Sequence, residues 1–237
     1  MKVDQSLPIA TIAADCAASR AVFESLGIDY SCGGPRSLAD AAHAEGLDPE
    51  VLVAGLRRLA AAGKNENWNE RPLVDLVRHL TAGYHHFVRN ELVSVSLQLS
   101  DLCTPSKRPS ADLQSLRSAL IRLSETLIPH MHEEEDTIFR EVLARESAWE
   151  SNERPLEGDL RNSIRRMIGE NGTMTAQLKT IRELRLRLID SNDQSPQCRA
   201  MLDDVSRLEA HLHESMFLEN CVLFPRAIVL QEQTASA

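Results

Sequence analysis

The sequence contains few aromatic residues and no long apolar run. Aromatic side chains make up 4% of the 237 residues, whereas Leu, Ala, Arg and Glu are abundant. This composition favours helices over sheets. No apolar stretch approaches the roughly 20 residues that span a bilayer. The first residues, MKVDQSLPIA, lack the apolar core of a secretory signal. We therefore expect an all-α protein without a membrane-spanning segment.

Positive charge and paired cysteines are also scarce. The chain carries 26 Lys and Arg against 35 Asp and Glu, a net charge of −9. Nucleic acids and anionic membranes are bound through basic patches, so we expect neither as a partner. The five cysteines are widely spaced and form no CxxC motif. An odd number of dispersed thiols is typical of a reduced, cytoplasmic chain.

Glycine and proline residues divide the chain into two regions. Residues 1–62 predict a small helical domain, with one helix over 9–25, a short helix that opens at Ser37 and another after Asp48. The polar residues 63–70 lack helical periodicity and are typical of a linker.

Residues 71–237 contain four long helical patterns separated by short polar loops. The patterns cover residues 71–102, 111–146, 157–190 and 197–230. Four helices of this length with short connections predict an antiparallel four-helix bundle.

Helical phase places polar side chains among the apolar residues that face the bundle interior. They are His85, His130, Glu134, Asn171, Ser215 and Glu219. A buried carboxylate is costly unless it is paired or bound to a metal, and the four-residue spacing of His130 and Glu134 lets both reach one ion. Two histidines with two glutamates suit iron or manganese better than a closed zinc site.

The remaining ionisable residues near these positions have other phases. Six of the eight histidines form close pairs in the sequence, yet the members of each pair point in different directions. His211 falls at the edge of the inward stripe and His213 outside it. Glu133 and Glu135 also face elsewhere. On the third helix, Ile189 is expected to face inward.

Two segments carry a family resemblance. The run AVFESLGIDYSCGG (residues 21–34) followed by Ser37-Leu38 resembles the small ScdA-type domain that opens the RIC family, the di-iron proteins for repair of iron centres. In the second region, HMHEEE from His130 resembles the family's HMxxEE motif. LENCVLFPRA (residues 218–227) is similar to the family's LEN ending, and Tyr84-His85 matches its Tyr-His pair.

The resemblance implies a hemerythrin-like bundle with a carboxylate-bridged di-iron centre. It also implies a role in restoring iron–sulfur clusters damaged by nitric oxide or oxidants, with the damaged iron–sulfur proteins as partners. Carried over by motif, His85 and His130 would bind one iron, and Glu134 and Glu219 would bridge.

The chain departs from the family at three positions. Asn171 and Ser215 stand where the family has two further histidine ligands, which the resemblance assigns to a second iron. Asn and Ser are weak neutral ligands, so we predict one iron, with two irons or a metal-free site left open. Ser31 replaces one of two adjacent cysteines, which leaves Cys32 as a candidate redox or iron-transfer thiol. Cys32 could also bridge two chains, so a homodimer stays open.

Three functions follow from these features. The first is an iron-binding repair protein of the RIC type. The second is a hemerythrin-like sensor or scavenger of nitric oxide or dioxygen at a single iron. The third is a metal-free paralogue that acts through protein contacts. No general base or substrate pocket is evident in the sequence, so whether the protein is an enzyme is left open. The number of irons per chain separates the three.

Overall fold

The structure is a computed structural model that describes residues 3–32, 35–62, 68–151, 158–191 and 195–235. In these ranges the chain is helical and contains no strand, apart from an isolated β-bridge between Pro8 and Ser37. The predicted all-α class is confirmed. Among the described helices, none combines the length and apolar character that a bilayer-spanning segment needs.

The chain forms two compact units. One unit comprises residues 1–76 together with 213–237, and the other comprises residues 77–212. The domain boundaries predicted at residues 62 and 71 stay a prediction. Most of the predicted linker, residues 63–67, lies outside the described residues, as do Gly33 and Gly34 and parts of two predicted loops.

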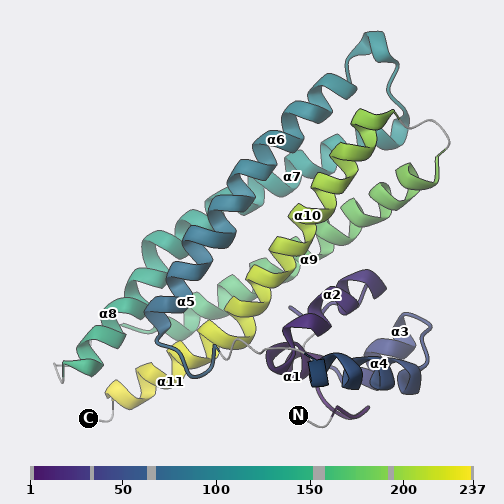
Figure 1. Ribbon diagram of the computed structural model, residues 1–237. Coiled ribbons are helices and arrows are strands. Elements are labelled where there is room, and N and C mark those ends of the chain that lie inside the picture. The colour runs from purple at the N-terminus through teal and green to yellow at the C-terminus, as the bar shows by residue number, and fades with distance from the viewer. Residues whose placement is uncertain (1–2, 33–34, 63–67, 152–157, 192–194, 236–237) are drawn as a thin grey trace. The chain divides into compact units, whose positions relative to one another are not determined.

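Residues 3–32 and 35–62, the described N-terminal part of the first unit, contain four helices (Figure 1). They are α1 (Ile9–Asp15), α2 (Ala17–Leu26), α3 (Leu38–Ala44) and α4 (Pro49–Ala62). The single helix predicted over residues 9–25 is wrong, because Cys16 is extended, with φ −142°. Nearby side chains satisfy the carbonyls at the break: Ser19 Oγ donates to the Cys16 carbonyl at 2.6 Å, and Arg20 Nε donates to the Ala13 carbonyl at 2.9 Å. Buried carbonyls need such donors at a helix end.

The C-terminal part of the first unit continues the last long helix. It contains the end of α10 (Pro196–Leu218), then η4 (Glu219–Leu223) and α11 (Phe224–Ala235). Arg20 forms an ion pair with Glu214 at 2.6 Å, and its guanidinium lies 4.8 Å from the Phe217 ring centre. Arg226 Nη1 donates to the Trp68 carbonyl at 2.6 Å. These contacts explain why residues 213–237 group with the N-terminal helices.

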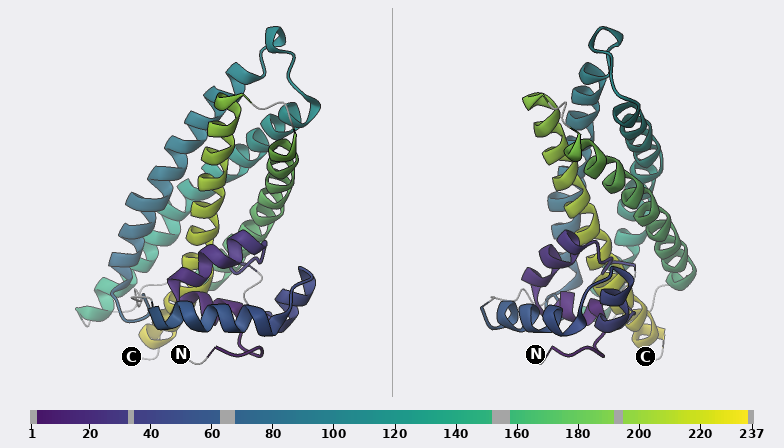
Figure 2. Two further views of the ribbon diagram at one scale, coloured as in Figure 1. Left: turned by 45° about the vertical axis from the view of Figure 1, so that its right-hand side comes forward. Right: turned by 90° about the vertical axis from the view of Figure 1, so that its right-hand side faces the viewer.

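The second unit is built from four long helical segments. The first segment consists of α5 (Leu73–His79), η1 (Leu80–His85) and α6 (His86–Leu102), and a short 3₁₀ turn, η2 (Pro105–Lys107), follows it. The second consists of α7 (Ala111–Glu133), η3 (Glu134–Ile138) and α8 (Phe139–Glu150). The third is α9 (Leu160–Asp190), and the fourth is α10. Figures 1 and 2 show α6, α7, α9 and α10 side by side. The predicted four-helix bundle is confirmed.

Neighbouring helices of this bundle contact one another in a closed ring, and polar side chains join three of the four pairs. Gln177 on α9 donates to Thr126 on α7 at 3.4 Å. Arg185 on α9 pairs with Glu209 on α10 at 3.4 Å. Gln98 on α6 donates to Asp204 on α10 at 2.7 Å. α6 and α7 also pack against each other, so each helix has two neighbours around one core.

The apolar stripe of α9 follows a heptad spacing. Leu160, Ile164, Met167, Met174, Leu178, Ile181 and Leu188 are all buried. The predicted inward position of Ile189 is wrong, because Ile189 is 46% exposed and Leu188 is buried in its place. A period of 3.6 residues points to residue 189 after eight turns, whereas helices that coil around each other keep a period of 3.5.

Three of the helical segments contain a π-helical turn. η1 ends at His85, η3 begins at Glu134 and η4 begins at Glu219. π turns are rare and are frequently found at functional sites. Each one here begins or ends at a residue that the sequence picks out as a candidate metal ligand.

Candidate metal centre

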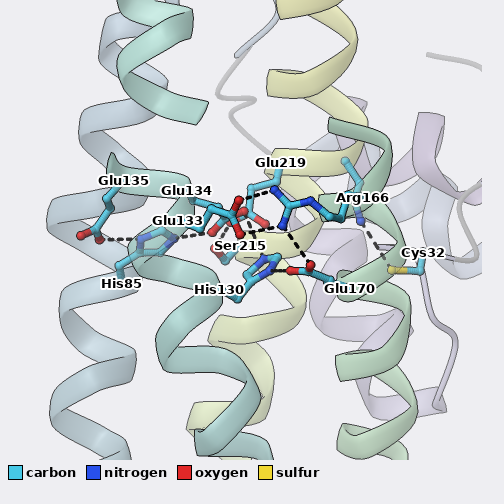
Figure 3. A network of polar contacts seen from close by, with 11 residues as sticks. Cys32, His85, His130, Glu133, Glu134, Glu135, Arg166, Glu170, Ser215 and Glu219 are labelled. Atoms are coloured by element: carbon cyan, nitrogen blue, oxygen red, sulfur yellow. Dashed lines mark hydrogen bonds and ion pairs between the residues drawn. The ribbon is translucent and has the colours of Figure 1, made fainter. Parts of the chain in front are cut away.

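His85, His130 and Glu134 come together inside the second unit (Figure 3). Their exposed fractions are 2%, 4% and 1%. His85 Nε2 lies 3.5 Å from Glu134 Oε2, and His130 Nε2 lies 3.3 Å from Glu134 Oε1. The two imidazoles therefore face the two oxygens of one buried carboxylate. The structure thus brings together three of the four predicted ligands within one unit.

A second carboxylate holds the far nitrogen of His85. Glu135 Oε1 lies 2.8 Å from His85 Nδ1 and also accepts from Arg89 Nη1 at 2.9 Å. The hydrogen bond from His85 lowers the pKa of Glu135 to about 2, helped by Arg89 and opposed by partial burial. An ionised Glu135 fixes the proton of His85 on Nδ1, which turns the lone pair of Nε2 toward Glu134.

His130 has a matching partner on the next helix. Glu170 Oε2 on α9 lies 2.7 Å from His130 Nδ1. Arg166, one turn earlier on α9, pairs with Glu170 at 3.3 Å and also forms an ion pair with Glu133. The Arg166 guanidinium lowers the pKa of Glu133. His130 is thus held as His85 is, with Nδ1 donating to a carboxylate and Nε2 facing Glu134.

Sequence reasoning missed both outer carboxylates. The helical phase predicts that Glu135 faces elsewhere, because a uniform 3.6-residue period turns it away from the inward stripe of its helix. It lies inside the π turn η3, which changes that phase. Glu170 lies 40 residues from His130, and no local spacing links them. A usable signal was present, since Glu170 precedes Asn171 at the position of the expected third-helix ligand.

Asn171 and Ser215, which stand at the positions of the missing histidines, are both buried. Asn171 on α9 is completely buried in the second unit. Ser215 and Glu219 lie in the first unit, where the Ser215 hydroxyl donates to Glu219 Oε1 at 2.6 Å (Figure 3). Both are buried, at 5% and 2% exposure. Ser215 therefore donates its hydroxyl proton to a carboxylate, whereas a histidine ligand at this position would offer a nitrogen lone pair to a metal.

The C-terminal histidines occupy other surroundings. The His211 ring stacks on Phe87 with ring centres 3.8 Å apart, and its Nδ1 lies 2.9 Å from the Arg207 carbonyl. His213 lies in the first unit, 6.5 Å from the Tyr30 ring centre. Neither ring takes the inward position of Ser215, as the helical phases predict.

Cys32 is half-buried in the first unit. An Asx turn holds it: Asp29 Oδ1 accepts from the backbone N–H groups of Ser31 and Cys32 at 2.9 and 3.0 Å. Its sulfur accepts from Asn220 Nδ2 on η4 at 3.5 Å (Figure 3). Its predicted role as a redox or iron-transfer thiol stays a prediction.

The donor set of the second unit fits a divalent transition metal. Two imidazole nitrogens and a carboxylate suit iron or manganese, and each histidine is held by an outer carboxylate, as metal-binding histidines usually are. The ligand atoms of His85 and Glu134 lie within 4.8 Å of one another. A metal here would supply the charge that a carboxylate as deeply buried as Glu134 requires.

Comparisons with known proteins give two findings. Residues 5–60 match the family model ScdA_N, described as a domain of unknown function. The chain is also 28% identical over 225 residues to iron-sulfur cluster repair proteins named YtfE, including those of two Escherichia coli strains and of Shigella boydii serotype 4. The aligned residues cover 93% of this chain and 96% of each of these relatives.

The two findings agree with the motifs in both halves of the sequence. The family model covers the N-terminal segment that resembles the ScdA-type domain, and the relatives extend the similarity through the helices that carry His85, His130 and Glu134. The chain is thus similar to named iron–sulfur cluster repair proteins along nearly its whole length.

Proposed function

We propose that the protein binds iron and acts in the repair of iron–sulfur clusters damaged by nitric oxide or oxidants. The observation that carries the proposal is the buried pair of histidines facing one carboxylate, each oriented by an outer carboxylate, in a chain similar throughout to named repair proteins. Damaged iron–sulfur proteins are the proposed partners. The relatives' names favour repair over the sensor and the metal-free alternative.

The proposed ligands are His85, His130, Glu134 and Glu219. Glu219 joins the other three on two grounds: its side chain is 2% exposed, and it begins a π turn as Glu134 does. An iron ion held there would supply a Lewis-acidic, redox-active centre with room for a small ligand, for which we propose nitric oxide or dioxygen. The chain's own part is to hold both Nε2 lone pairs toward the centre and to keep it dry.

We propose one iron per chain. His85 and His130 both turn Nε2 toward the Glu134 carboxylate, and these three residues would hold one ion. A second ion would depend on Asn171 and Ser215, which are neutral donors and weak ligands for iron. The Ser215 proton is moreover directed to Glu219.

Metal content tests this proposal. Protein purified without oxygen and loaded with Fe²⁺ is desalted, and iron per chain is measured together with optical spectra; we expect about one iron. Matched controls come from the histidine pairs. His130→Ala and His85→Ala are expected to lose the iron, whereas the exposed neighbours His132→Ala and His86→Ala keep it.

Each other outcome overturns part of the proposal. Two irons would refute the assignment of Asn171 and Ser215 as non-ligands. A wild-type protein that holds no iron, or a His132→Ala variant that loses it as His130→Ala does, would refute the site itself. The cytoplasmic location and the homodimer considered from the sequence stay predictions.

A further inference from the structure

A second thiol, that of Cys221, lies beside the turn that carries Cys32 in the first unit. Cys221 lies on η4, about 190 residues later in the sequence, and its sulfur donates to the Ser31 carbonyl at 3.8 Å. Ser31 is joined to Cys32 by one peptide bond, so the Cys221 sulfur touches the peptide group that leads into Cys32. Both cysteines are partly exposed to solvent.

Asn220 connects the two cysteine segments. Its side-chain Nδ2 donates to the Ser31 carbonyl at 3.4 Å and to Cys32 Sγ at 3.5 Å. The carboxylate of Asp29 fixes the other side of the turn by accepting from Ser31 Oγ at 2.8 Å and from the Cys32 N–H at 3.0 Å. The two contacts of Asn220 thus join the turn to η4, and the two contacts of Asp29 fix the turn itself, without a bond between the sulfurs.

The two sulfurs have different hydrogen-bonding roles. Cys221 acts as an S–H donor toward a carbonyl, whereas Cys32 accepts an N–H. A sulfur that accepts a hydrogen bond is placed to react as the nucleophile, because the thiolate is the reactive form and an N–H donor stabilises negative charge. Cys221 then stands as the second thiol that resolves a mixed disulfide.

We propose that Cys32 and Cys221 form a redox-active thiol pair that a low-molecular-weight disulfide such as oxidised glutathione converts to an intramolecular disulfide. The sequence singles out Cys32 as the one candidate redox thiol, because Ser31 replaces the adjacent cysteine that would be its partner. The structure assigns its partner instead to the segment LENCVLFPRA, at the opposite end of the sequence.

The reaction balances in two steps. The Cys32 sulfur attacks one sulfur of the glutathione disulfide, whose S–S bond breaks, and the released glutathione thiolate takes up a proton. Cys221 loses its proton and attacks the Cys32 sulfur of the mixed disulfide, which releases the second glutathione as a thiol. The two cysteines together lose two electrons and two protons, and the glutathione disulfide gains them.

The test uses the full-length chain in its reduced form, both without metal and loaded with Fe²⁺. Each sample is incubated with oxidised glutathione, quenched with an alkylating reagent and digested without reductant for mass spectrometry. We expect a peptide pair joined through Cys32 and Cys221, and a loss of two free thiols from the five in the chain. The pair should form in the metal-free sample, so this result does not depend on the proposed iron site.

Two variants sharpen the test. In Cys221→Ser the glutathione adduct on Cys32 should persist, at least about tenfold longer than in the wild type, because intramolecular resolution is lost. Cys198→Ser removes a thiol of the second unit and should leave the Cys32–Cys221 pair unchanged.

The proposal is overturned if wild-type Cys32 keeps its glutathione adduct without a crosslink, or if Cys32 crosslinks to a different cysteine. Should Cys221→Ser fail to fold, as circular dichroism would show, the peptide map of the wild-type protein decides alone.

Discussion

The outer carboxylate Glu170 offers the sharpest test of how the site is built. Glu170→Gln keeps the shape of the side chain and an oxygen 2.7 Å from His130 Nδ1, but removes its charge. Loss of such an outer partner typically lowers metal affinity about 10–100-fold, which corresponds to about 1.4–2.7 kcal/mol. We expect the Fe²⁺ affinity to fall in this range, with the iron content at saturation unchanged.

Two measurements report this change without relying on repair activity. Anaerobic titration against a competing chelator gives the Fe²⁺ affinity directly. Thermal unfolding at a fixed excess of free Fe²⁺ gives an independent value, because a ligand that binds only the folded state stabilises it. For a chain of this size the weaker binding should lower the iron-dependent gain in Tm by about 3–11 °C.

A control and a double-mutant cycle separate orientation of His130 from a general change in charge. Glu133→Gln also removes a carboxylate from Arg166, and Glu133 is about as exposed as Glu170, but the carboxylate at His130 Nδ1 is that of Glu170. We expect its Fe²⁺ affinity to stay within about twofold of the wild type. The His130→Ala variant, which should lose its iron on desalting, keeps only a weak affinity that the titration reports, and Glu170→Gln should have almost no further effect on that affinity. Equal losses in both glutamate variants, or full additivity in the cycle, would refute the role given to Glu170.

Three further predictions test other parts of the molecule. Combining Asn171→His with Ser215→His should raise iron from about one to about two per chain; unchanged content would contradict the placement of the missing ligands. Burial raises the pKa values of Cys103 and Cys198, so their alkylation should be slow at pH 8 and accelerate as the pH rises past 9, and fast labelling at pH 8 would oppose this. Arg226→Gln removes hydrogen bonds to two backbone carbonyls and should lower the free energy of unfolding by about 1.5–3 kcal/mol in denaturant titrations; an unchanged value would mean that these bonds add nothing.

The bundle and its buried polar residues could be predicted from the sequence because both depend on local periodicity. Long apolar repeats fix which face of each helix is buried, whatever that face contacts. His85, His130, Glu134, Asn171, Ser215 and Glu219 are all buried as their phases predict. Their role as ligands, or as replacements for ligands, is a separate question that burial does not answer.

The features that sequence reasoning missed depend on departures from ideal periodicity or on contacts between distant segments. Cys16 interrupts a helix whose apolar pattern continues without a break, because Ser19 and Arg20 donate to the carbonyls that the break leaves without a helical partner. Glu135 reaches His85 from within a π turn, and Cys221 meets Ser31 across most of the chain. A period of 3.6 residues contains no information on either of these contacts.

The positions of the π turns can be compared with the positions of the candidate ligands. A π turn gives up regular α-helical hydrogen bonding and persists where the surrounding structure requires it. The three segments that keep a candidate ligand, at His85, Glu134 and Glu219, each have a π turn at that residue. α9 is one uninterrupted α-helix, and it carries Asn171 in place of the expected histidine. The backbone therefore has a π turn at each of these three candidate ligands, although Asn171 and Ser215 stand where the family resemblance implies histidines. For this reason we expect restored histidines at Asn171 and Ser215 to bind metal without rearrangement of the helices.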